Sequence, residues 1–359
     1  MGAGGRYPKP GRGRSRAADR VPGRELRGSR LRVGRAAGVG RSQVGRPESR
    51  IDTLPQPPFA AHDSAHERGV TDGSPESFAG GGVGLLRLVH PFPSALDGIV
   101  TGAIVLLAGG PPVAALRLAL AMVLLQFAIG ALNDIVDLPI DRLAKPAKPL
   151  ASGSVELRAA RATLGLCLTA GLVLSAISGP GVLAVAVVGV LAGFAYDLRL
   201  KGTALSWLPW AAGIPLLPLY AWLGAGRGLS GFFLALLVMA AFAGTALALA
   251  NGIADFERDR MSGVRSIVVV LGPTAAWRIE AGLHLIVGVL ATGTAVVAGG
   301  LAWGPAVLLF GGLGLLGVGL VLGGGGSPGR RERGWELQAV GASCAAAGWL
   351  AIMIASGAL

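Results

Sequence analysis

Long apolar runs dominate the chain from Gly84 onward, and short polar or Gly/Pro-rich breaks separate them. Each run is about 20 residues long, which is the length an α-helix needs to cross the roughly 30 Å hydrocarbon core of a bilayer. Nine runs are expected to form membrane-spanning helices: residues 89–109, 112–132, 159–178, 181–196, 204–224, 229–253, 274–299, 302–322 and 337–357. The pattern therefore predicts an all-α, polytopic membrane protein with nine transmembrane helices.

Composition supports this prediction and excludes a large soluble globule. Of the 359 residues, 52% are hydrophobic and 14% are charged, and the mean hydropathy is +0.61. Soluble domains carry roughly 25% charged residues. The 59 glycines would allow helix backbones to approach closely within a bilayer, which favours a packed bundle.

The N-terminal segment, residues 1–83, has a different composition and is expected to be a disordered arm. Its first 80 residues hold 15 basic and 8 acidic side chains among Gly, Pro and Ser, with almost no apolar periodicity. The arm is interpreted either as a dispensable tail, including a start assigned too far upstream, or as a contact with anionic lipid head groups. Nucleic acid is not an expected partner, because only Tyr7 and Phe59 supply aromatic rings in the first 60 residues.

Charge placement in the remaining domain, residues 84–359, predicts its orientation. Most of its basic residues lie in the loops after the second, fourth, sixth and eighth apolar runs or at the adjoining helix ends. By the positive-inside rule, the N-terminus and these loops are expected on the cytoplasmic side of a bacterial or archaeal cell membrane. The C-terminus is then expected outside.

Two acidic motifs stand at matching ends of predicted spans. The first acidic motif runs from Asn133 to Asp141, and the second runs from Asn251 to Asp259; both read N-x-x-x-D-x-x-x-D. Residues four apart on a helix drift only about 80° over such a triplet, so each set is expected on one helix face. Asp134 falls in the same arc, and Pro139 is expected to kink or end the first helix.

Carboxylates gathered on one membrane face repel each other unless they hold cations, and oxygen ligands suit Mg²⁺ together with substrate phosphates. A single copy of the motif could be a solvated helix end, but two copies on the same predicted side favour metal–phosphate chemistry. The expected catalytic carboxylates are Asp134, Asp137, Asp141, Asp255 and Asp259. The expected substrate-binding residues near the motifs are Asn133, Arg142, Lys145, Lys148, Tyr196, Arg199, Lys201, Asn251 and Arg265.

With these motifs, the chain resembles the UbiA superfamily of intramembrane prenyltransferases. The resemblance extends to the Lys-Pro-x-Lys-Pro-Leu-x-Ser-Gly run from Lys145, the Gly263–Gly272 run and the opening Arg87-Leu-Val-His-Pro. It implies a nine-helix bundle around a central cavity, with Mg²⁺ at Asn133, Asp137, Asp141, Asn251, Asp255 and Asp259. It also implies that Arg87 contacts the diphosphate. The family's Tyr-x-x-x-Lys spacing is shifted by one after Tyr196, so Arg199 and Lys201 both stay candidates for its lysine.

The resulting hypothesis is transfer of a polyprenyl group from an allylic diphosphate donor to an aromatic, quinone-precursor-like acceptor or to a lipid acceptor. Membrane lipids are expected partners. A secondary transporter is the alternative, but it would place its acids near the middle of the spans, whereas these lie at the inner ends beside cations. A CDP-alcohol phosphotransferase needs its acidic motif in one contiguous stretch, and no such stretch occurs.

Overall fold

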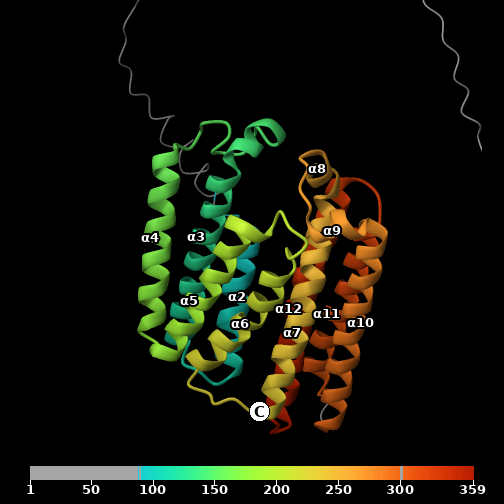
Figure 1. Ribbon diagram of the computed structural model, residues 1–359. Helices are drawn as coiled ribbons and strands as arrows, with labels where there is room; N and C mark the ends of the chain where they lie inside the picture. Colours follow the sequence, from blue (N-terminus) through green and yellow to red (C-terminus); the bar gives the residue numbers. More distant parts are fainter. Residues whose placement is uncertain (1–87, 89, 300–301) are drawn as a thin grey trace, which may run out of the picture. The chain divides into compact units, whose positions relative to one another are not determined.

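The structure, a computed structural model, describes Leu88, residues 90–299 and residues 302–359. The predicted arm and Arg87 lie outside the described residues. The helices are α2 (Pro91–Leu107), α3 (Pro112–Ala144), α4 (Leu157–Ala176), α5 (Pro180–Ala195), the π-helical turn η1 (Tyr196–Leu200), α6 (Leu208–Gly224), α7 (Gly231–Ala254), α8 (Phe256–Met261), α9 (Ile267–Leu271), α10 (Pro273–Val297), α11 (Trp303–Gly323) and α12 (Pro328–Ala355) (Figure 1). The described part of the chain contains no strand, so the all-α prediction is confirmed.

Each of the nine apolar runs contains one long helix, but their lengths differ. Seven are long and apolar enough to cross a membrane: α3, α4, α5 together with η1, α7, α10, α11 and α12. The helices α2 and α6 have only 17 residues each. Nine full spans are therefore not confirmed, although the positions of the apolar runs agree with the helices.

Two helices extend beyond their predicted ends, and one of them carries the first acidic motif. α3 continues through Pro139 to Ala144, so the proline does not end the helix and the whole motif stays on one element. α12 begins at Pro328, well before the predicted residue 337. Its first turns hold the charged segment 330–333, which hydropathy assigns to a loop because it marks only the apolar part of a helix.

The helices α11 and α12 pack closely through facing glycines. A Cβ on Gly319 would lie 2.6 Å from the carbonyl oxygen of Gly334, and a Cβ on Gly334 would lie 2.7 Å from that of Gly319. Gly312 and Gly341 repeat this arrangement further along the two helices. The glycines therefore permit backbone contact that larger residues would prevent, as expected for helix pairs in membranes.

The outward surface of the bundle is apolar, as a lipid environment requires. Large side chains such as Val113, Leu116 and Trp303 are 74%, 73% and 87% exposed. The short helix α8, which carries part of the second acidic motif, lies at the end of the bundle opposite the C-terminus (Figure 1). The chemistry-bearing residues are thus placed at one end of an apolar helical bundle.

Candidate active site

A cavity of about 1300 Å³ lies inside the bundle, and both acidic motifs line it. The lining residues from the first motif are Asn133, Asp137 and Asp141, and those from the second are Asn251, Asp255 and Asp259. Deeper in the bundle the wall is mostly apolar, with Ile104, Met122 and Leu217 among its residues. The expected convergence of the two motifs is therefore present in the structure.

The first motif holds its polar atoms on one side of α3, where Lys201 meets two of them. The Lys201 ammonium donates hydrogen bonds to the Asn133 amide oxygen at 2.9 Å and to an Asp137 carboxylate oxygen at 2.5 Å. Lys201 follows η1, and Arg199 within that turn also lines the cavity. Both candidates for the family's lysine therefore reach the cavity, and Lys201 is the one that bonds to the motif.

A second lysine, Lys148, joins the other two carboxylates of the first motif. Its ammonium donates to Asp134 at 2.7 Å and to Asp141 at 2.6 Å. Burial alone would lower the pKa of Lys148, but its hydrogen bonds to Asp134 and Asp141 outweigh that effect and raise the pKa. Lys148 thus stays protonated between two carboxylates.

Asp134 takes a different position from the other acids of its motif. Its side chain is 2% exposed, does not line the cavity, and also lies 3.2 Å from the His90 Nε2 atom. His90 precedes α2 with φ 50°, the only positive φ of a non-glycine residue in the described part of the chain. Asp134 therefore ties the start of α2 to α3 and to Lys148 behind the cavity wall.

The second motif crosses a break between two helices. Asn251 lies in the last turn of α7, Asp255 occupies the junction, and Asp259 belongs to α8. The prediction that this triplet lies on one continuous helix is wrong, but the Asp255 and Asp259 amides still bond to the carbonyls four residues earlier, at 3.1 and 3.0 Å. The helical spacing therefore survives the break, and the three side chains still share one face.

The acids of the second motif have polar partners of their own. Asp255 pairs with Arg258, and Asp259 accepts a hydrogen bond of 3.0 Å from the Ser266 hydroxyl. Burial raises the pKa of Asp259, and the Ser266 hydrogen bond partly opposes this. Burial disfavours the ionised form of Asp259, and a cation bound beside it would stabilise that form.

The remaining predicted cations divide into two groups. Lys145 lines the cavity. Loss of solvent around its ammonium, and to a smaller extent the positive charge of Arg258, lower the pKa of Lys145. Arg142 and Arg265 do not line the cavity, and both are exposed. Arg142 directly follows Asp141 on α3, so it points about 100° away from that residue, while the Arg265 amide bonds to the Gly202 carbonyl and connects two loops.

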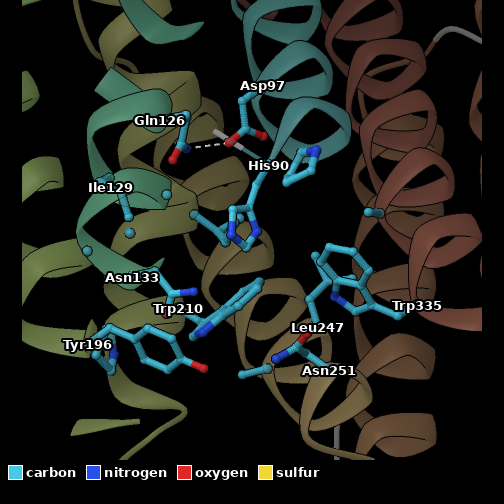
Figure 2. Close-up of a pocket in the computed structure, with 18 of the residues that line it drawn as sticks. His90, Asp97, Gln126, Ile129, Asn133, Tyr196, Trp210, Leu247, Asn251 and Trp335 are labelled. Carbon is cyan, nitrogen blue, oxygen red and sulfur yellow. Dashed lines mark hydrogen bonds between the residues drawn. The ribbon is translucent and has the colours of Figure 1, made fainter. Parts of the chain in front are cut away.

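The cavity also contains residues that the sequence analysis did not assign to the site. Asp197 is 3% exposed, lines the cavity, and interacts electrostatically with Lys201 and Asp137. Its position at the inner end of an apolar run, next to Tyr196, is the signal that could have identified it. Trp210 and Trp335 face the cavity together with Tyr196, as Figure 2 shows.

Figure 2 also shows a polar pair deeper in the cavity than Asn133. The Gln126 amide donates a hydrogen bond to the Asp97 carboxylate, and both side chains line the cavity. Gln126 lies two helical turns from Asn133 on nearly the same face of α3. The apolar part of the cavity therefore contains a hydrogen-bonded polar pair.

The carboxylates and amides of the two motifs offer oxygen atoms as metal ligands, and hard cations such as Mg²⁺ prefer oxygen ligands. Among the described residues, no three His, Cys, Asp or Glu side chains converge closely enough to hold a metal ion as they stand. Instead, Lys148 and Lys201 each bring two motif oxygens around one ammonium. The oxygens are thus already arranged in pairs around positive charge.

Members of one family resemble this chain in sequence and in fold. Residues 98–333 match the model of the UbiA prenyltransferase family. The digeranylgeranylglyceryl phosphate synthase of Pyrococcus furiosus is 28% identical over 232 residues, which are 63% of this chain and 82% of that protein. That of Methanoregula boonei is 33% identical over 121 residues, 33% of this chain and 43% of that protein.

Solved structures show the same fold. A UbiA homolog from Archaeoglobus fulgidus bound to GPP and Mg²⁺ matches 60% of this chain and 78% of its own, with a TM-score of 0.52 and 18% identity. The apo UbiA homolog from Aeropyrum pernix K1 matches 74% of this chain and 98% of its own, with a TM-score of 0.57 and 22% identity. With its apolar spanning helices, this integral membrane protein belongs to the UbiA prenyltransferase family.

Proposed function

We propose that the chain is an intramembrane prenyltransferase that moves a polyprenyl group from an allylic diphosphate to a hydrophobic lipid acceptor, with Mg²⁺ assisting the departure of diphosphate. The observation that carries the proposal is the convergence of both acidic motifs, with lysines, at one end of a cavity whose deeper wall is apolar. Such a cavity matches a molecule with a charged head and a long apolar tail. The charged head would lie at the motifs and the tail would follow the apolar wall.

The residues present fit a divalent cation. The side chains of the two acidic motifs line one cavity, and each offers a carboxylate or amide oxygen as a metal ligand: Asn133, Asp137, Asp141, Asn251, Asp255 and Asp259. Magnesium, when bound by these side chains, supplies positive charge that stabilises the diphosphate as it leaves. The A. fulgidus homolog with GPP and Mg²⁺ supports this assignment.

The chain's own cations bind and orient the diphosphate. Lys145, Lys148, Arg199 and Lys201 line the charged end of the cavity. Lys148 and Lys201 must turn from their carboxylate partners toward the phosphate oxygens, which is an exchange of one charge-assisted hydrogen bond for another. Positive charge placed there favours the departing group more than the intact donor, since negative charge develops on it as the bond breaks.

The transfer itself breaks the allylic C–O bond heterolytically, and the electron pair leaves with the diphosphate. An electron pair of the acceptor then forms the new bond to the same carbon, and the acceptor's proton passes to the diphosphate. The apolar wall excludes water that would otherwise react with the allylic carbocation left by this bond cleavage. Leu217 and Met239 belong to this wall.

The relatives favour a lipid acceptor over the aromatic, quinone-precursor-like acceptor that the sequence analysis also considered. Digeranylgeranylglyceryl phosphate synthases recur among the curated relatives, from Pyrococcus furiosus to Natronomonas pharaonis. We therefore infer an acceptor of the glycerol-phosphate lipid class. We also infer that the motif end of the bundle faces the cytoplasm, because the basic residues of the chain concentrate in the loops at that end.

The test is diphosphate release by the full chain in lipid nanodiscs. Geranylgeranyl diphosphate serves as donor, with geranylgeranylglyceryl phosphate and 1,4-dihydroxy-2-naphthoate as alternative acceptors. Release should require Mg²⁺ and an acceptor, and Asp137→Asn and Asp255→Asn should each lower it at least 100-fold, a loss of about 3 kcal/mol of transition-state stabilisation. Glu156→Gln, an exposed acid before α4 outside the cavity lining, is the matched control.

Unchanged turnover in both motif variants would refute the site assignment. Release with the naphthoate alone would replace the lipid acceptor by the aromatic one. The transporter alternative would be favoured if the chain released no diphosphate with either acceptor and bound neither the donor nor the metal.

A further inference from the structure

Four aromatic rings from four separate elements form a continuous row across the cavity. Aromatic residues make up only 6% of the chain, yet Phe92 of α2, Trp335 of α12, Trp210 of α6 and Tyr196 of η1 all line this cavity. Successive ring centroids lie 6.2, 6.5 and 6.0 Å apart, with interplanar angles of 68°, 82° and 85°. We call these four residues the aromatic row; Tyr196, Trp210 and Trp335 are labelled in Figure 2.

Phe92, at one end of the aromatic row, closely follows a residue that contacts Asp134. Phe92 stands two residues after His90, whose ring contacts Asp134. Phe92 and Trp335 meet edge to face, so α2 and α12 are joined at this level of the cavity.

The other rings lie beside the second acidic motif. Trp335 follows Arg331 by one helical turn, and Arg331 pairs with Glu257, which lies between Asp255 and Asp259 in the chain. Tyr196 interacts electrostatically with both of these aspartates. The aromatic row therefore adjoins both motifs.

Apart from the Asp97–Gln126 pair, the cavity wall beyond the row is mostly apolar. On α6, Trp210 is followed by Gly213, Ile214 and Leu217 along the cavity. A prenyl diphosphate whose head binds the motifs and whose tail follows this wall must place its first isoprene unit against the aromatic row. The carbon that loses the diphosphate belongs to that unit.

The position of Trp210 is fixed by close backbone packing. A Cβ on Gly244 of α7 would overlap the Trp210 carbonyl oxygen and would lie 3.0 Å from Ile214. The glycine therefore lets α6 lie directly against α7 at the height of the ring. Edge-to-face contacts on both sides of Trp210 further restrict its movement.

We propose that the aromatic row stabilises the allylic cation of the proposed prenyl transfer, with Trp210 and Trp335 as the rings that contact the reacting unit. When the C–O bond breaks, its electron pair leaves with the diphosphate, and the positive charge is shared between carbons 1 and 3 of the prenyl group. Aliphatic walls cannot compensate this charge, whereas an aromatic face attracts a cation within about 6 Å of its centre. Trp210 and Trp335 would do so without a hydroxyl, thiol or amine that captures the allylic cation, which the acceptor must do.

The experiment separates cation stabilisation from simple packing by comparing two ligands of the same shape. One is a geranylgeranyl diphosphate analogue with a protonated tertiary amine in place of carbon 3. The other is geranylgeranyl thiolodiphosphate, which does not ionise; we call it the neutral analogue because its prenyl chain is uncharged. Dissociation constants are measured for the full chain in nanodiscs with Mg²⁺, so no acceptor and no turnover are required. The readout is the ratio of the two constants.

The wild-type chain should prefer the amine. Trp210→Leu should lower this preference about tenfold while binding of the neutral analogue changes little, and Trp210→Phe should keep most of it. Trp335→Leu provides the same measurement at the neighbouring ring if the first variant fails to fold. Trp303→Leu is the matched control, because Trp303 is 87% exposed and does not line the cavity.

Equal weakening of both ligands by Trp210→Leu, or an unchanged ratio, would overturn the proposed role and leave the rings as a wall for the tail. This inference rests on the proposed function, and the two fail differently. A wild-type chain that binds neither analogue refutes the prenyl diphosphate site itself, whereas one that binds both without a tryptophan-dependent preference refutes only the role of the aromatic row.

Discussion

Replacing Lys148 by methionine would remove the cation that joins two carboxylates, Asp141 in the cavity wall and Asp134 behind it. The ammonium lies 2.7 Å from Asp134 and 2.6 Å from Asp141, whose side chains are 2% and 9% exposed. Methionine has nearly the same length, so the substitution leaves the volume filled but removes the ammonium between the two carboxylates.

The expected loss of stability follows from this burial. Removing one partner of a buried ion pair costs about 3–5 kcal/mol, because the other charge stays behind without compensation. The Lys148 side chain is 20% exposed and Asp134 keeps its contact with His90, so we expect the lower end of that range, about 3 kcal/mol.

The measurement is the free energy of unfolding in mixed micelles titrated with dodecyl sulfate. A double-mutant cycle with Asp134→Asn isolates the contact, since Lys148→Met should cost about 1–2 kcal/mol less when Asp134 is already neutral. Arg142→Met, which removes an exposed cation six residues earlier, is the control and should cost under about 0.5 kcal/mol. A Lys148→Met variant as stable as the control, or a cycle in which the two losses simply add, would refute the reasoning.

Three other outcomes follow, two from the structure and one from the sequence of the arm. Lys201→Met should bind Mn²⁺ several-fold more tightly in an electron paramagnetic resonance titration, because it releases the two motif oxygens, yet it should raise the donor KM; weaker Mn²⁺ binding would contradict this. Gly319→Leu should destabilise the bundle by at least about 2 kcal/mol in the dodecyl sulfate titration, because the new side chain meets the backbone at Gly334. Gly314→Leu, where no atom lies within 4 Å of the added Cβ, should be tolerated, and equal losses at both glycines would exclude the packing argument. Deletion of residues 1–75 should leave diphosphate release largely intact in nanodiscs, whereas complete loss in an inserted protein would show that the arm contributes to activity.

Much of the helix layout was predictable because hydropathy responds directly to burial in lipid. The convergence of the two motifs was also predictable, since both stand at the same-side ends of spans. The path of α3 through Pro139 was not, because packing of the surrounding helices outweighs the loss of one backbone hydrogen bond. The outward direction of Arg142 could have been found from its position next to Asp141 on the helix.

The pairing of side chains from distant segments carried no local signal. Nothing near Asp134 in the sequence shows that His90 and Lys148 enclose it, because 44 residues separate it from His90. The same holds for the aromatic row, whose members Phe92, Tyr196 and Trp335 come from different thirds of the domain. Contacts of this kind depend on the tertiary arrangement, which periodicity does not report.

The lysines between the motif carboxylates have a consequence for the order in which ligands associate. Each ammonium serves two competing partners, the acids of its own chain and the phosphate oxygens of a donor. A metal ion that takes over the acids releases Lys148 and Lys201 toward the phosphate, and a phosphate that attracts the lysines leaves the acids open to metal. Metal and donor should therefore bind with positive cooperativity, each increasing the affinity for the other by the same factor.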